Sequence, residues 1–271
     1  MKIFKNKNSL KKAIANKDIA FIPTMGSLHS GHKKLIYVAK KKCKFTLVSI
    51  FVNPKQFNSN YDFKRYPRSL RQDIKILKNL KVTFLYIPNF NQVYNFKTKY
   101  KVSLHKFQNK LCGKFRPGHF KGVLNVVNRF LEILNPKYIV LGKKDFQQMF
   151  LIKDHIKKNK INTKIIVHKI VRKNNGVALS SRNKNLSTSD MTIASKVFRY
   201  LKREKSNIKR KIQKKINTNK LYNNIIELGV KKIDYIELIN LNTLKKPNRI
   251  NKKFNIFIAY YLGKVRLIDN V

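Results

Sequence analysis

The sequence predicts an α/β protein with a Rossmann-like parallel-sheet N-terminal domain, residues 1–172, and a smaller α+β C-terminal domain, residues 173–271. Up to about residue 171, apolar runs typical of buried parallel strands alternate with stretches of helical period. Beyond Ser187 the order changes to two helical stretches followed by three strand-like runs, which indicates a different architecture.

Helix and strand patterns alternate from the start of the chain. Residues 1–17 predict a helix with Leu10 and Ile14 on its inward face. A buried strand is expected at 18–22, followed by a glycine-containing turn and a helix. The nearly continuous apolar run 45–52 predicts the second buried strand.

The alternation continues through the rest of the N-terminal domain. Pro67 suits the first turn of a helix, and Leu70 is expected on its inward face. The remaining elements are expected as strands at 82–87, 138–141 and 165–171, helices at 118–134 and after 142–145, and short elements within 89–115.

The C-terminal domain is predicted to begin with helices. Ser187-Thr-Ser-Asp190 resembles a capping box that opens the first of them. The remaining elements are expected as a helix near 216–228 and strands at 233–239, 254–261 and 265–268.

The chain is extremely basic, with 62 Lys plus Arg against 12 Asp plus Glu and a formal net charge of +50. Such a charge favours nucleic acid or an anionic membrane as a partner. The lysines are spread along the whole chain, however, and the abundant Lys, Asn, Ile, Phe and Tyr share A/T-rich codons. We therefore interpret the charge as codon bias, and we predict no specific nucleic-acid partner and no membrane partner.

The spacing of the cysteines and the absence of long apolar runs predict a cytoplasmic protein. Cys43 and Cys112 lie far apart without metal-ligand spacing, which is typical of a reducing compartment. No apolar run approaches the ~20 residues that span a bilayer. The basic N-terminal segment also lacks the apolar centre of a signal peptide.

The most distinctive stretch follows the first predicted buried strand and reads Met25-Gly-Ser-Leu-His-Ser-Gly-His32. A strand that passes through a glycine-containing turn into a helix directs backbone N–H groups and the positive helix end at a bound phosphate. His29 and His32, three residues apart, can face the same ligand. The pattern resembles the His-x-Gly-His signature of nucleotidyltransferases, which holds ATP phosphates.

Polar residues also follow the other predicted strands of this sheet. They are Asn53 and Gln56, Gly142 to Asp145, and Leu179 to Arg182. Because ligands of parallel α/β sheets bind outside the carboxyl ends of the strands, we expect these residues to converge on one site.

Seven stretches together resemble the pantothenate synthetase, or pantoate–β-alanine ligase, family. They keep one order along nearly the whole chain, at 23–32, 48–57, 65–68, 116–123, 142–148, 179–183 and 262–270. The resemblance implies that the carboxylate of pantoate attacks the α-phosphate of ATP, giving pantoyl adenylate and pyrophosphate. The amine of β-alanine then displaces AMP. It further implies Mg²⁺ with the phosphates, whose protein ligands stay unassigned, and a homodimer.

The resemblance also implies roles for individual residues. The catalytic residues would be His29, His32, in the place of the proton donor, and Lys144. The ATP site would comprise Met25, Gly26, Ser27, Leu28, His29, Ser30, Gly31, His32, Gly142, Lys143, Lys144, Asp145, Val171, Leu179, Ser180, Ser181 and Arg182. Pantoate and β-alanine would contact Gln56, Gln148, Asn53 and Arg116, with Tyr66 as a further contributor.

The chain departs from the family pattern at two acids, which Lys143 and Cys112 replace. Two alternatives stay open at this point. One is a different His-x-Gly-His nucleotidyltransferase, such as a cytidylyltransferase, and the other is a nucleic-acid-binding module suggested by the charge alone.

Overall fold

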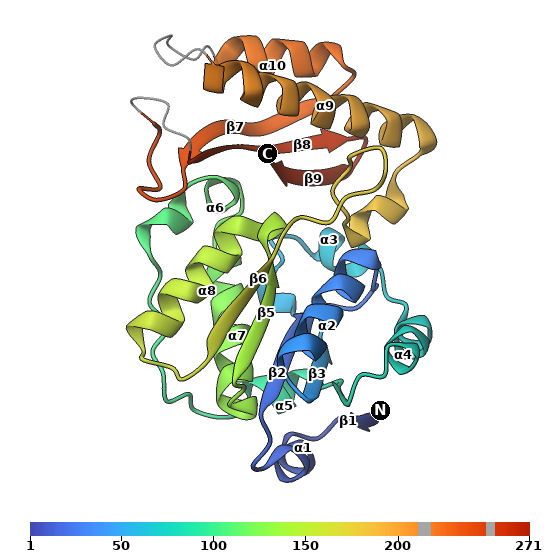
Figure 1. The fold of residues 1–271 in the computed structure, drawn as a ribbon, viewed down its shortest axis with the longest axis vertical. Helices are drawn as coiled ribbons and strands as arrows, with labels where there is room; N and C mark the ends of the chain where they lie inside the picture. Colours follow the sequence, from blue (N-terminus) through green and yellow to red (C-terminus); the bar gives the residue numbers. More distant parts are fainter. Residues whose placement is uncertain (211–217, 248–252) are drawn as a thin grey trace. The chain divides into compact units, whose positions relative to one another are not determined.

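The computed structural model describes residues 1–210, 218–247 and 253–271 (Figure 1). The chain forms two compact units, Met1–Ile170 and Val171–Val271. Among the helices of the described ranges, none combines the length and the apolar character that crossing a bilayer requires.

The first unit is built on a six-stranded sheet in which every strand pair is parallel, in the order β1-β4-β3-β2-β5-β6. This confirms the predicted fold class. The strands are β1 Lys2–Phe4, β2 Ile19–Thr24, β3 Phe45–Ile50, β4 Phe84–Tyr86, β5 Tyr138–Gly142 and β6 Lys164–His168.

The strand order places a topological switch between β2 and β5. From β2 the chain proceeds outward through β3 and β4, then crosses back to add β5 and β6 on the other side of β2. The loops after β2 and β5 therefore leave the sheet in opposite directions, and such a switch point is where parallel α/β sheets bind ligands.

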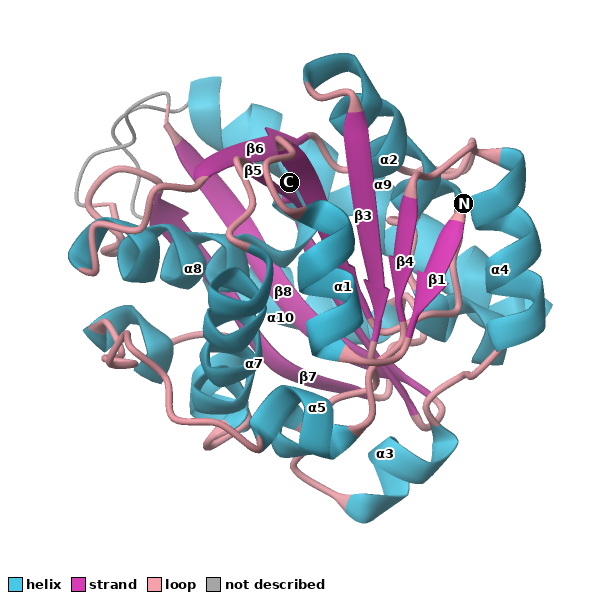
Figure 2. Ribbon diagram, turned by 90° about the horizontal axis from the view of Figure 1, so that it is seen from below, coloured by secondary structure: helices cyan, strands magenta, loops and turns pink. Residues whose placement is uncertain are grey.

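Helices cover both faces of this sheet (Figure 2). On one face α2 and α4 pack through a core that includes Ile36, Leu77 and Val48. On the other face Phe130 of α7 contacts the rings of Phe21 and Tyr86 edge-on, with centroids 5.6 and 6.2 Å away. The helices of this unit are α1 Lys7–Ile14, α2 Ser30–Lys42, α3 Asn60–Arg65, α4 Leu70–Asn79, α5 Phe90–Tyr94, α6 Cys112–Phe115, α7 His119–Leu134 and α8 Phe146–Lys158.

The second unit contains the antiparallel sheet β7-β8-β9 and the helices α9 and α10. Their apolar residues form one core, for example Leu201, Ile225 and Ile258. The predicted capping box is present, because Ser187 Oγ accepts from Asp190 N at 3.1 Å and Asp190 Oδ2 accepts from Ser187 N at 3.2 Å. The bounds are α9 Thr188–Arg210, α10 Thr218–Glu227, β7 Lys232–Asn240, β8 Phe254–Leu262 and β9 Val265–Asn270. Residues 216 and 217 of the predicted second helix lie outside the described residues.

Three expectations were wrong in detail. The first residues are strand β1 rather than helix, because they pair with β4 at the edge of the sheet. Pro67 precedes α4, and Leu70 is 43% exposed because the inward position in the first turn belongs to Asp73. The strand β6 ends at His168, before the predicted Val171.

Candidate active site

The loop between β2 and α2 is held by a buried carboxylate. Gly26 and Ser27 both have positive φ, 77° and 51°, so the chain turns sharply after β2. The turn presents two successive backbone N–H groups to Asp73 of α4. Ser27 N donates to Oδ2 and Leu28 N donates to Oδ1, each at 2.8 Å. Asp73 is 1% exposed, so these charge-assisted bonds fix the loop.

The two predicted histidines lie side by side at the N-terminus of α2. Their ring centroids are 4.0 Å apart. His29 is the N-cap, and its Nδ1 accepts from Gly31 N at 3.1 Å, while His29 N donates to Nδ1 of His32 at 3.3 Å. Each Nδ1 is thus an acceptor, which places the proton of each neutral ring on Nε2.

The imidazole of His32 is neutral at physiological pH. Burial, the neighbouring His29 and the charge of Lys144 together lower the pKa of His32 from 6.5 to about 3. Lys144 lies in the 3₁₀ turn η3 Lys143–Asp145 that follows β5, and its Nζ is 3.7 Å from Asp145 Oδ1. The charge of Lys144, which follows β5, thus acts on His32, which follows β2.

The loop after β3 brings the first pair of predicted substrate residues to the same edge. Asn53 caps the 3₁₀ turn η1 Pro54–Gln56, and both Asn53 and Gln56 are buried. Asn53 Nδ2 donates to Gln56 Oε1 at 3.3 Å and to Gly122 O of α7 at 3.2 Å. Gln56 Nε2 donates to Met25 Sδ at 3.1 Å, which connects this loop to the one after β2.

Arg116 and His119 support the same loop from the start of α7. Arg116 Nη2 donates to Gln56 O at 3.2 Å, and His119 Nδ1 donates to the same oxygen at 2.7 Å. His119 therefore carries its proton on Nδ1, and its Nε2 is the acceptor for Arg116 Nη1 at 3.2 Å. These contacts give both residues a role in positioning Gln56.

Gln148 lies partly buried in the first turn of α8, directly after the Gly142–Asp145 turn. The preceding Gln147 is 6% exposed, and its Nε2 donates to Phe107 O and Lys110 O, both at 2.7 Å. Gln147 thus ties α8 to the segment before α7. Tyr66, the further predicted contributor, is buried, and its ring contacts that of Phe57 edge-on at 5.6 Å.

The other predicted nucleotide residues belong to the second unit. Val171 and Leu179 face each other across a hairpin, where Leu179 N donates to Val171 O at 3.0 Å. Ser180 caps the 3₁₀ turn η4 Ser181–Asn185, and its Oγ accepts from Arg182 N at 3.3 Å. This segment is therefore ordered by its own contacts within Val171–Val271.

The residues at the carboxyl edge of the sheet do not form a metal centre. The described ranges contain no group of three or more His, Cys, Asp or Glu side chains that could hold an ion. Both oxygens of Asp73 already accept backbone N–H groups, and Asp145 pairs with Lys144. The donor set therefore does not fit a resident Mg²⁺ held by the protein.

Sequence reasoning did not identify Asp73, Gln147 or Tyr94 as parts of this site. Tyr94 OH donates to Asn53 Oδ1 at 2.9 Å, and burial raises the pKa of this phenol to about 12, so it remains a donor. One signal was available for Asp73. It is one of 12 acids, and it lies one helical turn after Leu70, the residue that was expected on the inward face.

A parallel sheet with a switch point, and a strand–turn–helix loop carrying two histidines beside it, define a Rossmann-like α/β protein with a His-x-Gly-His loop. The sequence profile described as pantoate-beta-alanine ligase matches residues 2–271. The chain belongs to the pantoate-beta-alanine ligase family.

Individual relatives agree with this assignment. A pantothenate synthetase of Francisella tularensis subsp. novicida (strain U112) is 43% identical over 265 residues, 97% of this chain and 92% of the relative. A crystal structure of the pantoate-beta-alanine ligase of Francisella tularensis, complexed with beta-gamma ATP and beta-alanine, is 41% identical with a TM-score of 0.84 and covers 100% and 97% of the two chains. The crystal structure of pantothenate synthetase from Thermus thermophilus is 29% identical with a TM-score of 0.88, covering 100% and 99%.

Proposed function

We propose that this chain is a pantoate–β-alanine ligase that condenses pantoate with β-alanine at the expense of ATP. The observation that carries the proposal is the pair of imidazoles at the N-terminus of α2, next to Lys144 and to the buried Gln56, in a chain whose family match spans residues 2–271.

In the first step an oxygen of the pantoate carboxylate attacks the α-phosphorus, and the bond from that phosphorus to the bridging oxygen of pyrophosphate breaks. Negative charge gathers on the phosphoryl oxygens, so fixed donors lower the barrier. The Nε2–H groups of His29 and His32, the positive end of α2 and the ammonium of Lys144 are the donors that this chain offers.

The neutral state of His32 defines what it contributes. A pKa of about 3 in the free protein makes Nε2–H a hydrogen-bond donor rather than an acid. Bound phosphates add negative charge beside the ring, which favours the protonated form. The Nε2–H of His32 would then donate a hydrogen bond to the phosphoryl oxygens of the departing pyrophosphate.

In the second step the amine of β-alanine attacks the acyl carbon of pantoyl adenylate. The bond from this carbon to the phosphate oxygen breaks, AMP leaves, and the amine loses a proton. Gln56 and Gln148 would hold pantoate through their amides, with Asn53 and Arg116 fixing the loop of Gln56. Tight positioning of this kind converts a bimolecular attack into an intramolecular one.

The first unit would carry the catalysis, and the second would act as a lid that supplies Val171 and Leu179 to Arg182 to the nucleotide. Support comes from the family profile, which extends over both units. Mg²⁺ would enter as the complex with ATP, held by phosphate oxygens and water. We further propose a homodimer, and we propose the cytoplasm as its compartment, consistent with two buried cysteines, Cys43 and Cys112, that form no disulfide.

The purified protein is expected to form AMP, pyrophosphate and pantothenate from Mg-ATP, pantoate and β-alanine. Omitting pantoate should abolish pyrophosphate release, whereas omitting β-alanine should leave a single burst of it. If folded protein releases no pyrophosphate with pantoate but does so with another acid or with CTP, the chain is a different His-x-Gly-His transferase.

A further inference from the structure

An arginine at the start of the second unit joins the segment that precedes η4 to the C-terminal strand. Residues 171–179 form a short hairpin, in which Arg172 bridges Ala178 and Lys173 N donates to Val177 O at 2.9 Å. Gly176 takes a φ of 90° in its turn. Both ends of the hairpin, Val171 and Leu179, are residues that the proposed function assigns to ATP.

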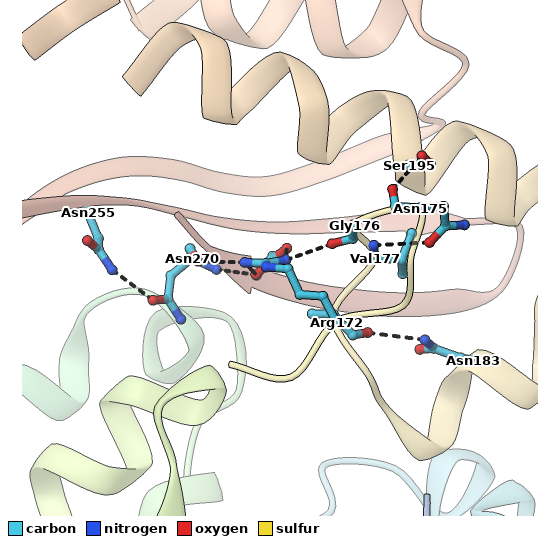
Figure 3. Close-up of polar contacts among 10 residues, drawn as sticks. Arg172, Asn175, Gly176, Val177, Asn183, Ser195, Asn255 and Asn270 are labelled. Carbon is cyan, nitrogen blue, oxygen red and sulfur yellow. Dashed lines mark hydrogen bonds and ion pairs between the residues drawn. The ribbon is translucent and has the colours of Figure 1, made fainter. Parts of the chain in front are cut away.

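The guanidinium of Arg172 uses several of its N–H groups at once (Figure 3). Nη1 donates to Asp269 Oδ2 at 2.6 Å and Nη2 donates to Asp269 Oδ1 at 2.9 Å, a bidentate pair with β9. Nη1 also donates to Gly176 O at 3.1 Å, and Nη2 to Asn270 O at 3.1 Å. One side chain therefore clamps the turn of the hairpin to the last strand of the chain.

The same hairpin is seated on α9. Ser195 Oγ donates to Asn175 O at 2.7 Å, and the ring of Phe198 lies 4.1 Å from the guanidinium carbon of Arg172. A Cβ at Gly176 would come within 2.1 Å of the Phe198 ring, so the turn is packed directly against this helix. The hairpin also contacts η4, because Asn183 Nδ2 donates to Ala178 O at 3.1 Å.

We propose that Arg172 and Asp269 are positioning residues for ATP binding. They hold the 171–179 hairpin in the conformation that presents the backbone of Val171 and the Leu179–Arg182 segment to the nucleotide. This inference rests on the proposed function. Lysine cannot replace Arg172, because a single ammonium cannot span both carboxylate oxygens and two carbonyl oxygens.

The unit contains a matched control pair. Arg266 Nε donates to Asp234 Oδ2 at 2.7 Å between β9 and β7, and the side chains are similarly buried, 17% and 4% exposed against 19% and 10% for Arg172 and Asp269. Arg266→Lys therefore disturbs an arginine–aspartate pair of the same unit that joins β9 to β7 and whose two residues lie outside 171–179.

The test compares ATP affinity, measured by calorimetry with Mg-ATP and without pantoate, in the wild type, Arg172→Lys and Arg266→Lys. Arg172→Lys is expected to weaken ATP binding roughly fivefold to tenfold. Arg266→Lys should leave it within about twofold at a comparable loss of thermal stability. In steady state, the KM for ATP should rise in Arg172→Lys while the KM for β-alanine stays unchanged.

If Arg172→Lys does not fold, Ser195→Ala gives the same comparison, since it removes the bond from α9 to Asn175 O. It also removes the bond that Ser195 Oγ accepts from Arg199 Nη2 within α9, which lies outside the hairpin. The inference would be overturned if the hairpin variant bound ATP as tightly as the wild type, or if the hairpin and control variants lost ATP affinity equally. Neither result would contradict the proposed function. A wild type that binds ATP but makes no pantothenate contradicts the proposed reaction and leaves the hairpin comparison valid. A wild type that binds no ATP contradicts both.

Discussion

The imidazole of His32 shows how the environment of one residue defines its chemistry. The ring accepts the backbone N–H of His29 at Nδ1 and is kept neutral by burial and by two neighbouring groups, His29 and Lys144. It is therefore preset as a donor at Nε2. The sequence revealed the pair of histidines, but the tautomer and the protonation state follow from contacts that no spacing rule contains.

Replacing His32 tests its role in the adenylation step. His32→Ala is expected to slow single-turnover pyrophosphate release by roughly a hundredfold to a thousandfold, because a preorganised donor is lost. The matched control is His105→Ala, since His105 also caps a short helix through Nδ1 in the same unit. A near-normal rate for His32→Ala would remove this residue from the mechanism.

The same ring should make stability depend on pH. Its pKa is about 3 when folded and 6.5 when unfolded, so below pH 6.5 the unfolded chain binds more protons. The contribution is fully present above pH 6.5 and is lost as the pH falls toward about 3. Urea midpoints at several pH values in this window should fall less steeply with acid in His32→Gln than in the wild type. If the urea midpoints of His32→Gln and the wild type fell equally with acid, the neutral state of His32 would be contradicted.

Asp73 provides a second test at the level of one residue. Asp73→Asn turns one acceptor into a donor that faces the N–H of Ser27 or Leu28, and leaving a buried group unpaired costs about 1–3 kcal/mol. We expect a loss of this size in urea unfolding, together with a lower adenylation rate. Asp18→Asn, which breaks an exposed pair with Lys137, serves as the control and should change neither quantity appreciably.

At the level of elements, the sequence predicted most of the architecture because buried strands and helices place apolar residues at a regular spacing along the chain. The apolar stripe of α7 is an example, since Phe120, Val127 and Phe130 recur at helical spacing and are all buried. Strand β1 was missed because its pairing with β4 is a long-range contact. Leu70 was misassigned because periodicity cannot tell that the inward position belongs to an aspartate with backbone partners.

The approach of α7 to the loop after β3 depends on Gly122. A Cβ there would lie 2.0 Å from Lys55 O, so Gly122→Ala must push the helix away from η1. We expect a destabilisation of about 1–3 kcal/mol and a higher KM for pantoate, because Gly122 O also holds Asn53. The exposed neighbour Lys121→Ala should leave both unchanged. An unaltered KM for pantoate would show that the close approach of Gly122 to η1 does not affect substrate binding.

For the whole molecule, the net charge of +50 opposes compaction and self-association alike. Raising NaCl from about 0.05 M to about 0.5 M shortens the range of this repulsion from roughly 14 Å to 4 Å. The urea midpoint and the dimer fraction in sedimentation should both increase with salt. Sucrose at matched osmolality, which does not screen charge, is the control for each. Salt-independent values would show that the lysines are spaced widely enough not to interact.

The codon bias that we infer from composition bears on Gly142, the glycine at the end of β5. Glycine codons begin with two guanines, so the A/T pressure that we infer from composition removes glycine wherever another residue is tolerated, and only nine remain. Gly26, Gly122 and Gly176 persist for reasons of backbone angle or close contact. Gly142 has neither reason, with a φ of −90° and no atom within 4 Å of its missing Cβ. Under the proposed function, the open space beside Gly142 is where an atom of the nucleotide would approach the backbone.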